Sequence, residues 1–252
     1  KDAGSGTGLG RASAGLSQRC HGQTIKTQPL SKVDIIWVID ESGSMQTKRK
    51  DIAANAATFF AQAKNRGLDF RMGVTNVCSP QGPWKSAVGK FCSAASASPQ
   101  HDGGKDRFLT PAEQATFAAC INNPPGFEQG SEYGLVNAKE AVARHLPRAS
   151  GDQSKIRQNA QLVLNVVTDE GPQSLKSVLS NNDFTKCTLS PGTQSKLDSA
   201  IKGYLDYFSG KPDADTALDQ FQVIGGVCGS SGGSCSYTPQ IAHGYKELAQ
   251  AL

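Results

Sequence analysis

Two short acidic segments contain the residue types that hold divalent cations. Residues 40–44 (DESGS) offer a carboxylate and two hydroxyls at alternate positions, and residues 168–171 (TDEG) offer further oxygens. Mg²⁺ takes about six oxygen ligands and keeps several waters, so a few protein oxygens suffice. An ion with few directly bound carboxylates stays electrophilic and accepts an anionic oxygen from a partner. The first segment can turn the carboxylate of Asp40 and the hydroxyls of Ser42 and Ser44 toward one point, which predicts a metal site with an open coordination position.

Each acidic segment directly follows an apolar run that is typical of a buried strand. Residues 33–39 (VDIIWVI) and 160–168 (AQLVLNVVT) are rich in β-branched residues, as strands buried on both faces require. Open α/β sheets bind ligands outside the carboxyl ends of their strands, where the strand order reverses. We therefore expect the two segments to meet at one edge of a sheet.

Strand and helix patterns alternate along most of the chain. This alternation predicts an α/β fold with a doubly wound, mostly parallel sheet flanked by helices. A short helix is expected after Thr110, with Pro111 at its first position and Glu113 reaching back to its start. The other helices are expected at about 46–66, 132–146, 193–209 and 240–252, and the other strands at 69–77 and 221–227.

Composition divides the chain into two parts. Residues 1–31 are rich in Gly, Ser, Thr and Gln and predict a flexible leader or linker, whereas residues 32–252 predict one domain with insertions at about 78–130 and 184–218. Residues 1–32 hold five basic residues and one acidic residue, so they carry the whole net charge of +4. Residues 33–252 therefore have no net charge and give no electrostatic indication of nucleic-acid binding. No apolar run reaches the ~18 residues of a membrane helix, so we expect no transmembrane span.

The seven cysteines lie mostly in polar loop sequences without a C-x-x-C motif. This distribution favours disulfides and an exported protein, located outside the cell, on its surface or at an outer membrane. A cytosolic protein with ordinary thiols is the alternative. Cys228 and Cys235 are candidates to close a small loop, and two of three further cysteines are expected to pair. Those three are Cys78, Cys92 and Cys120.

The segment 40–44 after an apolar strand, with 168–171 after a later one, resembles the von Willebrand factor A (integrin I-like) domain family, bacterial surface type. The resemblance covers about 32–252 and implies a metal-ion-dependent adhesion site. The residues implied for this site are Asp40, Ser42, Ser44 and Asp169. It implies that both serines bind the ion directly and that the aspartates act largely through water. The ion would be Mg²⁺, or else Mn²⁺ or Ca²⁺, and the partner a protein or surface ligand that presents a carboxylate.

The wider pattern is similar to that of bacterial surface lipoproteins that act in adhesion and gliding motility. Subunits of a cell-envelope complex are further partners that this similarity implies. Family members usually continue with another strand and a cysteine, which we would expect beyond residue 252.

One ligand of the family pattern has no counterpart here. The family uses a threonine before its third helix, whereas residues 128–135 (EQGSEYGL) contain none. Ser131 is the nearest hydroxyl, and Glu128, Gln129 and Glu132 are the alternatives. A glutamate at this position would shift the preference towards Ca²⁺ or Mn²⁺.

Simpler interpretations of these residues are also available. Asp40 or Ser44 can cap the following helix without binding a metal. Glu41 and Glu170 are expected to be solvated rather than to bind the ion. We expect all four histidines to lie on the surface, namely His21, His101, His145 and His243.

Three function classes follow from these observations. The sequence has no Gly-x-Ser-x-Gly motif and no histidine in a plausible catalytic setting, so we expect a binding module without catalytic residues. A metal-assisted hydrolase would need a general base, for which Glu132 or Glu170 are the candidates. The third class is a structural scaffold of an envelope complex whose metal site is degenerate.

Overall fold

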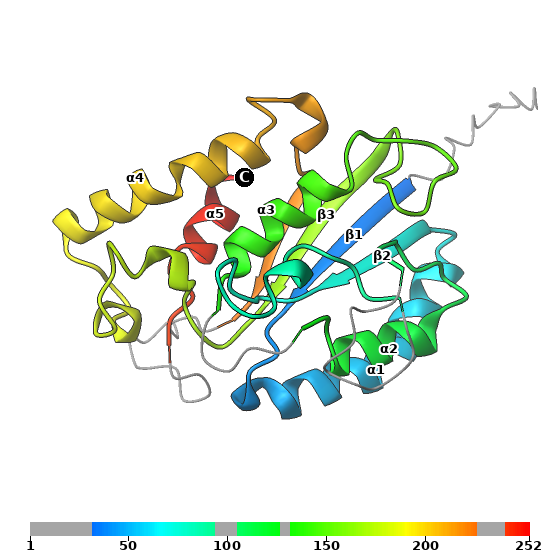
Figure 1. Cartoon of the computed structure of the whole chain (residues 1–252), viewed down its shortest axis with the longest axis horizontal. Helices are drawn as coiled ribbons and strands as arrows, with labels where there is room; N and C mark the ends of the chain where they lie inside the picture. The colour runs from blue at the N-terminus through cyan, green and yellow to red at the C-terminus, as the bar shows by residue number, and fades with distance from the viewer. Residues whose placement is uncertain (1–31, 94–104, 127–131, 226–239) are drawn as a thin grey trace, which may run out of the picture.

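The computed structural model describes residues 32–93, 105–126, 132–225 and 240–252. Within these ranges the chain forms one all-parallel sheet of four strands in the order β2-β1-β3-β4, with helices on both faces (Figure 1). The predicted α/β fold is therefore confirmed. The strands are β1 (Lys32–Ile39), β2 (Asp69–Thr75), β3 (Ala160–Val167) and β4 (Gln220–Ile224). The helices are α1 (Gln46–Asn65), α2 (Gln114–Asn122), α3 (Gly134–Arg144), α4 (Pro191–Phe208) and α5 (Tyr245–Ala251).

The strand order reverses between β1 and β3. β2 pairs with one side of β1 and β3 with the other, and Ile39 at the end of β1 is level with Val167 at the end of β3. The two segments stay side by side beyond the ends of β1 and β3, since the Asp40 N–H donates to the Val167 oxygen at 3.0 Å. Both acidic segments thus begin at the position where open α/β sheets bind ligands.

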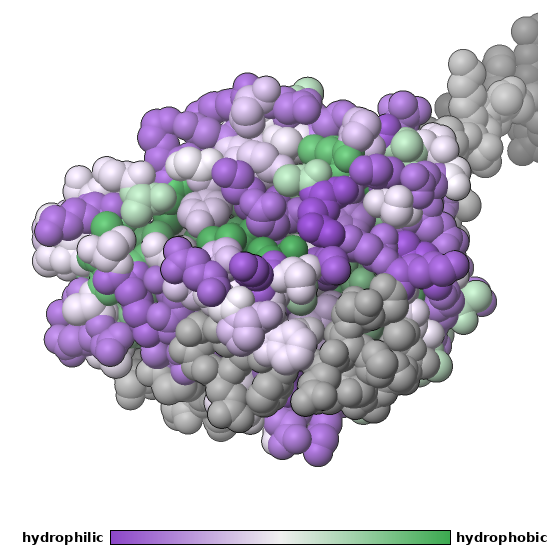
Figure 2. Space-filling view, viewed as in Figure 1, coloured by the Kyte–Doolittle hydropathy of each residue, from purple (hydrophilic) through white to green (hydrophobic). Residues whose placement is uncertain are grey.

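Alternating side chains of the sheet enter two separate cores. In β1, Ile36 and Val38 face the layer of α3, α4 and α5, whereas Ile35 and Ile39 face α1 and α2. Strands covered on both faces need apolar residues at nearly every position, which explains the runs seen in β1 and β3. The outer surface over α3 and α4 is mostly hydrophilic, with a small area of hydrophobic side chains showing between the polar ones (Figure 2).

Two helices begin later than the sequence predicts. α5 begins at Tyr245 rather than 240, because Gly244 has a φ of 90° that a right-handed helix excludes. α2 begins at Gln114 rather than at Pro111. The predicted hydrogen bond from Glu113 back to Thr110 is nevertheless present, since Glu113 Oε2 accepts from the Thr110 N–H at 2.9 Å. The predicted insertion at 184–218 contains α4, which packs into the larger core.

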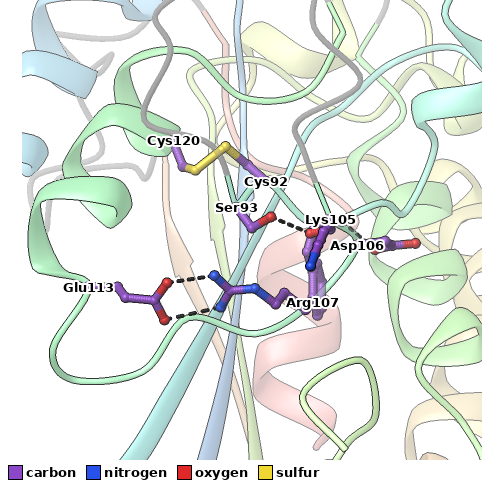
Figure 3. Close-up of a disulfide and its surroundings, with 8 residues drawn as sticks. Cys92, Ser93, Lys105, Asp106, Arg107, Glu113 and Cys120 are labelled. Carbon is purple, nitrogen blue, oxygen red and sulfur yellow. Dashed lines mark hydrogen bonds and ion pairs between the residues drawn. A yellow bond between two sulfur atoms is a disulfide. The ribbon is translucent and has the colours of Figure 1, made fainter.

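Within the insertion after β2, a disulfide ties the loop that follows the strand to α2. It joins Cys92 to Cys120, both buried, across a sequence separation of 28 residues (Figure 3). The Arg107–Glu113 ion pair, with Nη2 and Oε1 2.6 Å apart, lies in the same insertion. The prediction that two of the three cysteines in this region pair is confirmed, and Cys78 instead donates its thiol to Glu41 at 3.2 Å.

Loss of this disulfide is expected to destabilise the domain by about 3 kcal/mol, because the bond removes conformational freedom from an unfolded loop of this length. The Cys92→Ala/Cys120→Ala double variant should show this loss in urea denaturation. A reductant is unsuitable, since Cys187 is also disulfide-bonded. Each single alanine variant breaks the same bond and should lose nearly as much as the double variant. Unchanged denaturation midpoints in all three would contradict the expectation.

Several predictions lie outside the described residues. They concern the leader 1–31, the pairing of Cys228 with Cys235, and the histidines His21 and His101. Among the residues that the structure describes, no helix combines the length and hydrophobicity needed to cross a bilayer. The disulfide is consistent with export, because such bonds persist in oxidising compartments.

Candidate metal centre

Three buried carboxylates converge at the ends of β1 and β3. Asp40, Glu132 and Asp169 each place one carboxylate oxygen within 4.8 Å of the other two. All three residues are at most 1% exposed. Uncompensated carboxylates are rarely buried together, because each loses its hydration and repels its neighbours. This group is therefore the strongest candidate for a functional site in the described part of the chain.

The loop after β1 turns its polar groups towards one point. Asp40 Oδ1 accepts from the Ser42 N–H at 2.8 Å, which bends the chain directly after the strand. The Ser42 and Ser44 hydroxyl oxygens are 3.0 Å apart, and Ser44 Oγ donates to Asp169 Oδ1 at 3.1 Å. Neither Asp40 nor Ser44 caps α1, whose N-cap is Met45 without a side-chain hydrogen bond. The capping interpretation of these residues is therefore wrong.

Glu132 enters the cluster from the residues before α3. Its backbone oxygen accepts from the Gln173 N–H at 2.7 Å, and the next N–H, of Tyr133, donates to the Val77 oxygen at 2.8 Å. These bonds hold Glu132 between the loops that follow β2 and β3. Its side chain provides the third carboxylate of the group.

The Glu132 side chain is incompletely satisfied. Oε2 lies 3.2 Å from Thr168 Oγ1, but Oε1 is buried without a hydrogen-bond partner among the described residues. Burial, together with the negative charge of Asp40, raises the pKa of Glu132 to about 10. The metal-free site therefore keeps this carboxyl protonated at neutral pH.

Thr168 links two of the three carboxyl groups. Its Oγ1 lies 3.0 Å from Asp40 Oδ2 as well as 3.2 Å from the Glu132 carboxyl. The same oxygen accepts from the Glu170 N–H at 3.1 Å, which shapes the turn after β3. One hydroxyl proton cannot satisfy every acceptor around it, so the oxygen cluster is rich in lone pairs.

Two cations lie beside the cluster. Lys48 Nζ is 2.7 Å from Asp169 Oδ2. The Arg49 Nη1 donates to the backbone oxygens of Asp40 and Ser42 at 2.8 and 2.9 Å. Arg49 thereby braces the loop, whereas Lys48 neutralises one of its acids.

The donor set fits a hard divalent cation. Carboxylate and hydroxyl oxygens are the ligands that Mg²⁺, Mn²⁺ and Ca²⁺ prefer. The partnerless Glu132 Oε1 and the crowded acids are the features that a bound dication would relieve. Asp40, Ser42, Ser44, Asp169 and Glu132 would hold it, and the ion would supply a positive centre for an anionic oxygen.

The structure tests the other predictions for this region in part. Asp40, Ser42, Ser44 and Asp169 are brought together as the spacing predicts. Glu132, one of the alternatives, lies in the cluster, whereas Ser131, Glu128 and Gln129 lie outside the described residues.

The prediction that Glu41 is solvated is wrong. Glu41 is 3% exposed, and its carboxylate accepts from the Val77 N–H at 3.1 Å and from the Cys78 thiol. Burial raises the pKa of its carboxyl to about 7 despite these bonds. Glu170 is half-buried, and burial followed by the charge of Asp40 raises its pKa as well.

Two histidines predicted at the surface are buried. His145 stacks on Phe91 with ring centroids 3.7 Å apart, and His243 lies between the Lys186 carbonyl and the Glu247 carboxylate. Hydrogen-bond acceptors inside the fold make their burial possible, and a single sequence does not reveal such partners.

The sequence did not single out Lys48, and it indicated Thr168 only as part of the segment 168–171, without a role of its own. Lys48 follows Ser44 by four residues, a spacing that places two residues on one face where the chain is helical, so periodicity offered a weak signal. Thr168 is adjacent to Asp169 but points back towards Asp40, which only the paired strand ends reveal.

The site closes with Tyr245 from α5. A Cβ on Gly134 would lie 2.2 Å from the Tyr245 hydroxyl, so glycine is needed where α3 begins. The hydroxyl is buried, and burial, followed by the negative charges of Glu132 and Asp40, raises its pKa. Comparisons with models of known protein families and with curated proteins find no match for this chain.

Proposed function

We propose that this domain is a divalent-cation-dependent binding module of an exported protein, which engages an acidic group of its partner through a bound metal. The observation that carries the proposal is the convergence of Asp40, Glu132 and Asp169 beside two serine hydroxyls. The likeness of residues 40–44 and 168–171 to the metal-ion-dependent adhesion site of von Willebrand factor A domains supports the same function.

The oxygen set also favours binding a partner over holding a purely structural ion. A structural ion is normally enclosed by its protein ligands, whereas Ser44 is exposed and borders the buried acids. A carboxylate that reaches the ion from outside would therefore complete the coordination. The disulfide supports placing this activity outside the cytoplasm or at the cell surface.

Replacing Asp40 by alanine is expected to abolish cation binding. Loss of outer-shell partners alone costs metal sites about 10–100-fold in affinity, so removal of this carboxylate should cost at least about a hundredfold. Titration calorimetry with Mn²⁺, Mg²⁺ and Ca²⁺ measures the change. Asp51→Asn, which removes an exposed carboxylate of α1, is the matched control and should bind as the unaltered domain does. Equal affinity in the Asp40 variant would refute the site.

The partner chemistry is tested separately. A peptide with one glutamate and the same peptide with glutamine should differ in binding to the Mn²⁺-loaded domain, and EDTA should remove the difference. Proton relaxation of the Mn²⁺-bound water reports directly whether the carboxylate displaces it. Metal binding without any preference for the acidic peptide would overturn the adhesion function and leave the cation site standing.

A structural scaffold is one alternative to this function. A native-state ligand present at 100 times its dissociation constant adds about 2.7 kcal/mol to stability, so metal binding raises the melting temperature. No shift at millimolar Mg²⁺, Mn²⁺ or Ca²⁺ would favour the scaffold and contradict our proposal.

A further inference from the structure

Lys48 forms an ion pair with a carboxylate of the acidic cluster, whereas Arg49 bonds only backbone oxygens in the contacts described above. Lys48 lies in the first turn of α1, and its Nζ forms an ion pair of 2.7 Å with Asp169 Oδ2. The pair is asymmetric, because the Asp169 side chain is 1% exposed whereas the Lys48 side chain is 38% exposed. A solvent-accessible ammonium thus covers a buried carboxylate of the candidate metal centre.

This contact differs from an ordinary surface salt bridge. Exposed ion pairs contribute little, since both partners stay hydrated when they separate. Asp169, however, lies within 4.8 Å of two further carboxyl groups and has lost its hydration. Its other oxygen accepts from the Ser44 hydroxyl at 3.1 Å. Lys48 therefore supplies positive charge that the cluster would otherwise obtain from a bound ion.

We propose that Lys48 is a built-in counter-ion that competes with the divalent cation for the acidic cluster and so sets the cation concentration at which the site fills. The proposal rests on the metal-binding function inferred above. It assigns to Lys48 a role in tuning the metal centre rather than in binding the partner directly.

Lys48 and Arg49 differ in how freely their side chains can move away from the acidic cluster. Arg49 is 8% exposed and its Nη1 is held by two backbone oxygens of the metal loop. Lys48 has a flexible four-carbon stem, and water can reach its side chain. Its ammonium can therefore swing into solvent when a dication arrives, without any change in the backbone. Arg49 stays in place in both states and contributes a constant background charge.

Coulomb repulsion sets the size of the effect. A single charge and a dication on the order of 5 Å apart in a water-like dielectric repel each other enough to change an equilibrium about tenfold. Because Lys48 is partly exposed, added salt should screen the repulsion. Removing the ammonium should accordingly raise cation affinity, most strongly at low ionic strength.

The experiment compares three variants of the whole domain by calorimetric titration with Mn²⁺ and Mg²⁺ at two salt concentrations. Lys48→Gln is expected to bind both ions about tenfold more tightly at low salt, with a smaller gain at high salt. Lys48→Arg keeps the charge and should stay close to the unaltered domain. Lys50→Gln removes an exposed lysine from the same turn, outside the cluster contacts, and should change affinity by less than about twofold.

Thermal melts supply a readout that a purely structural lysine would not produce. Without metal, Lys48→Gln should melt at a lower temperature than the unaltered domain, because the acids lose their counter-ion. With saturating Mn²⁺ the difference should shrink or reverse. A melting temperature lowered equally with and without metal would overturn the proposal.

The outcomes separate this inference from the proposed function. Binding of metal by the unaltered domain, with no gain in Lys48→Gln, would refute the role of Lys48 and leave the metal site intact. Binding by Lys48→Gln alone would support the counter-ion and refute metal binding as the native function. Binding by neither protein would refute both.

Discussion

Asp34→Ala is expected to destabilise the domain by about 3–5 kcal/mol, the largest effect of any single substitution considered for this fold. Asp34 lies inside β1 and is completely buried. Its carboxylate accepts from Arg71 Nη2 at 2.8 Å and from Arg157 Nε at 2.8 Å. Removing one partner of a buried ion pair costs this much because the remaining charge stays desolvated and unpaired. Here two guanidinium groups would be left.

The surrounding bonds make relaxation difficult. Arg71 also donates to the backbone oxygens of Asp152 and Lys155, and Arg157 donates to those of Val33 and Asp69. Neither side chain can turn to solvent without breaking these bonds at the amino ends of the strands. The network therefore joins β1 and β2 to the loop before β3.

Urea denaturation of Asp34→Ala against Asp69→Asn tests this expectation. Asp69 pairs with the same Arg157, at 2.6 Å, but its side chain is 45% exposed. Such a pair contributes at most about 1 kcal/mol, so the control should unfold close to the unaltered domain. Equal losses in the two variants would show that burial of Asp34 does not govern the effect.

Glu132→Gln is expected to stabilise the metal-free domain and to abolish its cation binding. Glutamine keeps the size of the side chain but has no acidic proton to lose, so the crowded acids no longer oppose its burial. It also removes an anionic ligand of the candidate metal centre. The opposite signs of the two effects identify a residue retained for function at a cost in stability.

The expected stabilisation by Glu132→Gln depends on pH, because the pKa of Glu132 differs between the folded and the unfolded chain. The pKa of Glu132 is raised to about 10 in the folded domain, against about 4.5 when unfolded. The unfolded chain therefore releases this proton first, and folding stability falls as the pH rises from about 4.5 towards 10. Glu132→Gln should remove this decline, with a gain on the order of a few kcal/mol at pH 7.

Chemical denaturation from pH 5 to 9 without metal measures this gain. Glu140→Gln neutralises an exposed glutamate of α3 and should follow the unaltered domain throughout. If both variants decline with pH as the unaltered domain does, Glu132 is ionised in the folded state and the prediction is wrong. Calorimetry on the same samples then reports whether cation binding has been lost.

The sequence by itself determined the order of the elements and the position of the site. The runs before Asp40 and Asp169 are short, rich in β-branched residues and apolar at nearly every position, a pattern typical of strands covered on both faces. Parallel strands place their carboxyl ends at one edge, so the two acidic segments had to meet if these strands were neighbours. Local chemistry and periodicity carry this information, because each depends on residues close together in the chain.

Only the tertiary structure decided which further side chains enter the site. Glu132 was one of four candidates for the remaining ligand. Backbone hydrogen bonds from Gln173 to the Glu132 oxygen and from the next residue to the Val77 oxygen hold it beside the cluster. Lys48 reaches Asp169 across 121 positions in the sequence. Such pairings depend on strand register and helix placement, for which short segments carry no signal.

The burial of polar residues was also a tertiary outcome. Asp34 and Glu41 read as ordinary acids in the sequence, yet both are enclosed by donors from distant segments. A charged side chain is normally solvated unless partners compensate its desolvation, and those partners become visible only when the chain is folded. Residue types and their alternation thus defined the scaffold, whereas three-dimensional packing selected the groups that complete its site.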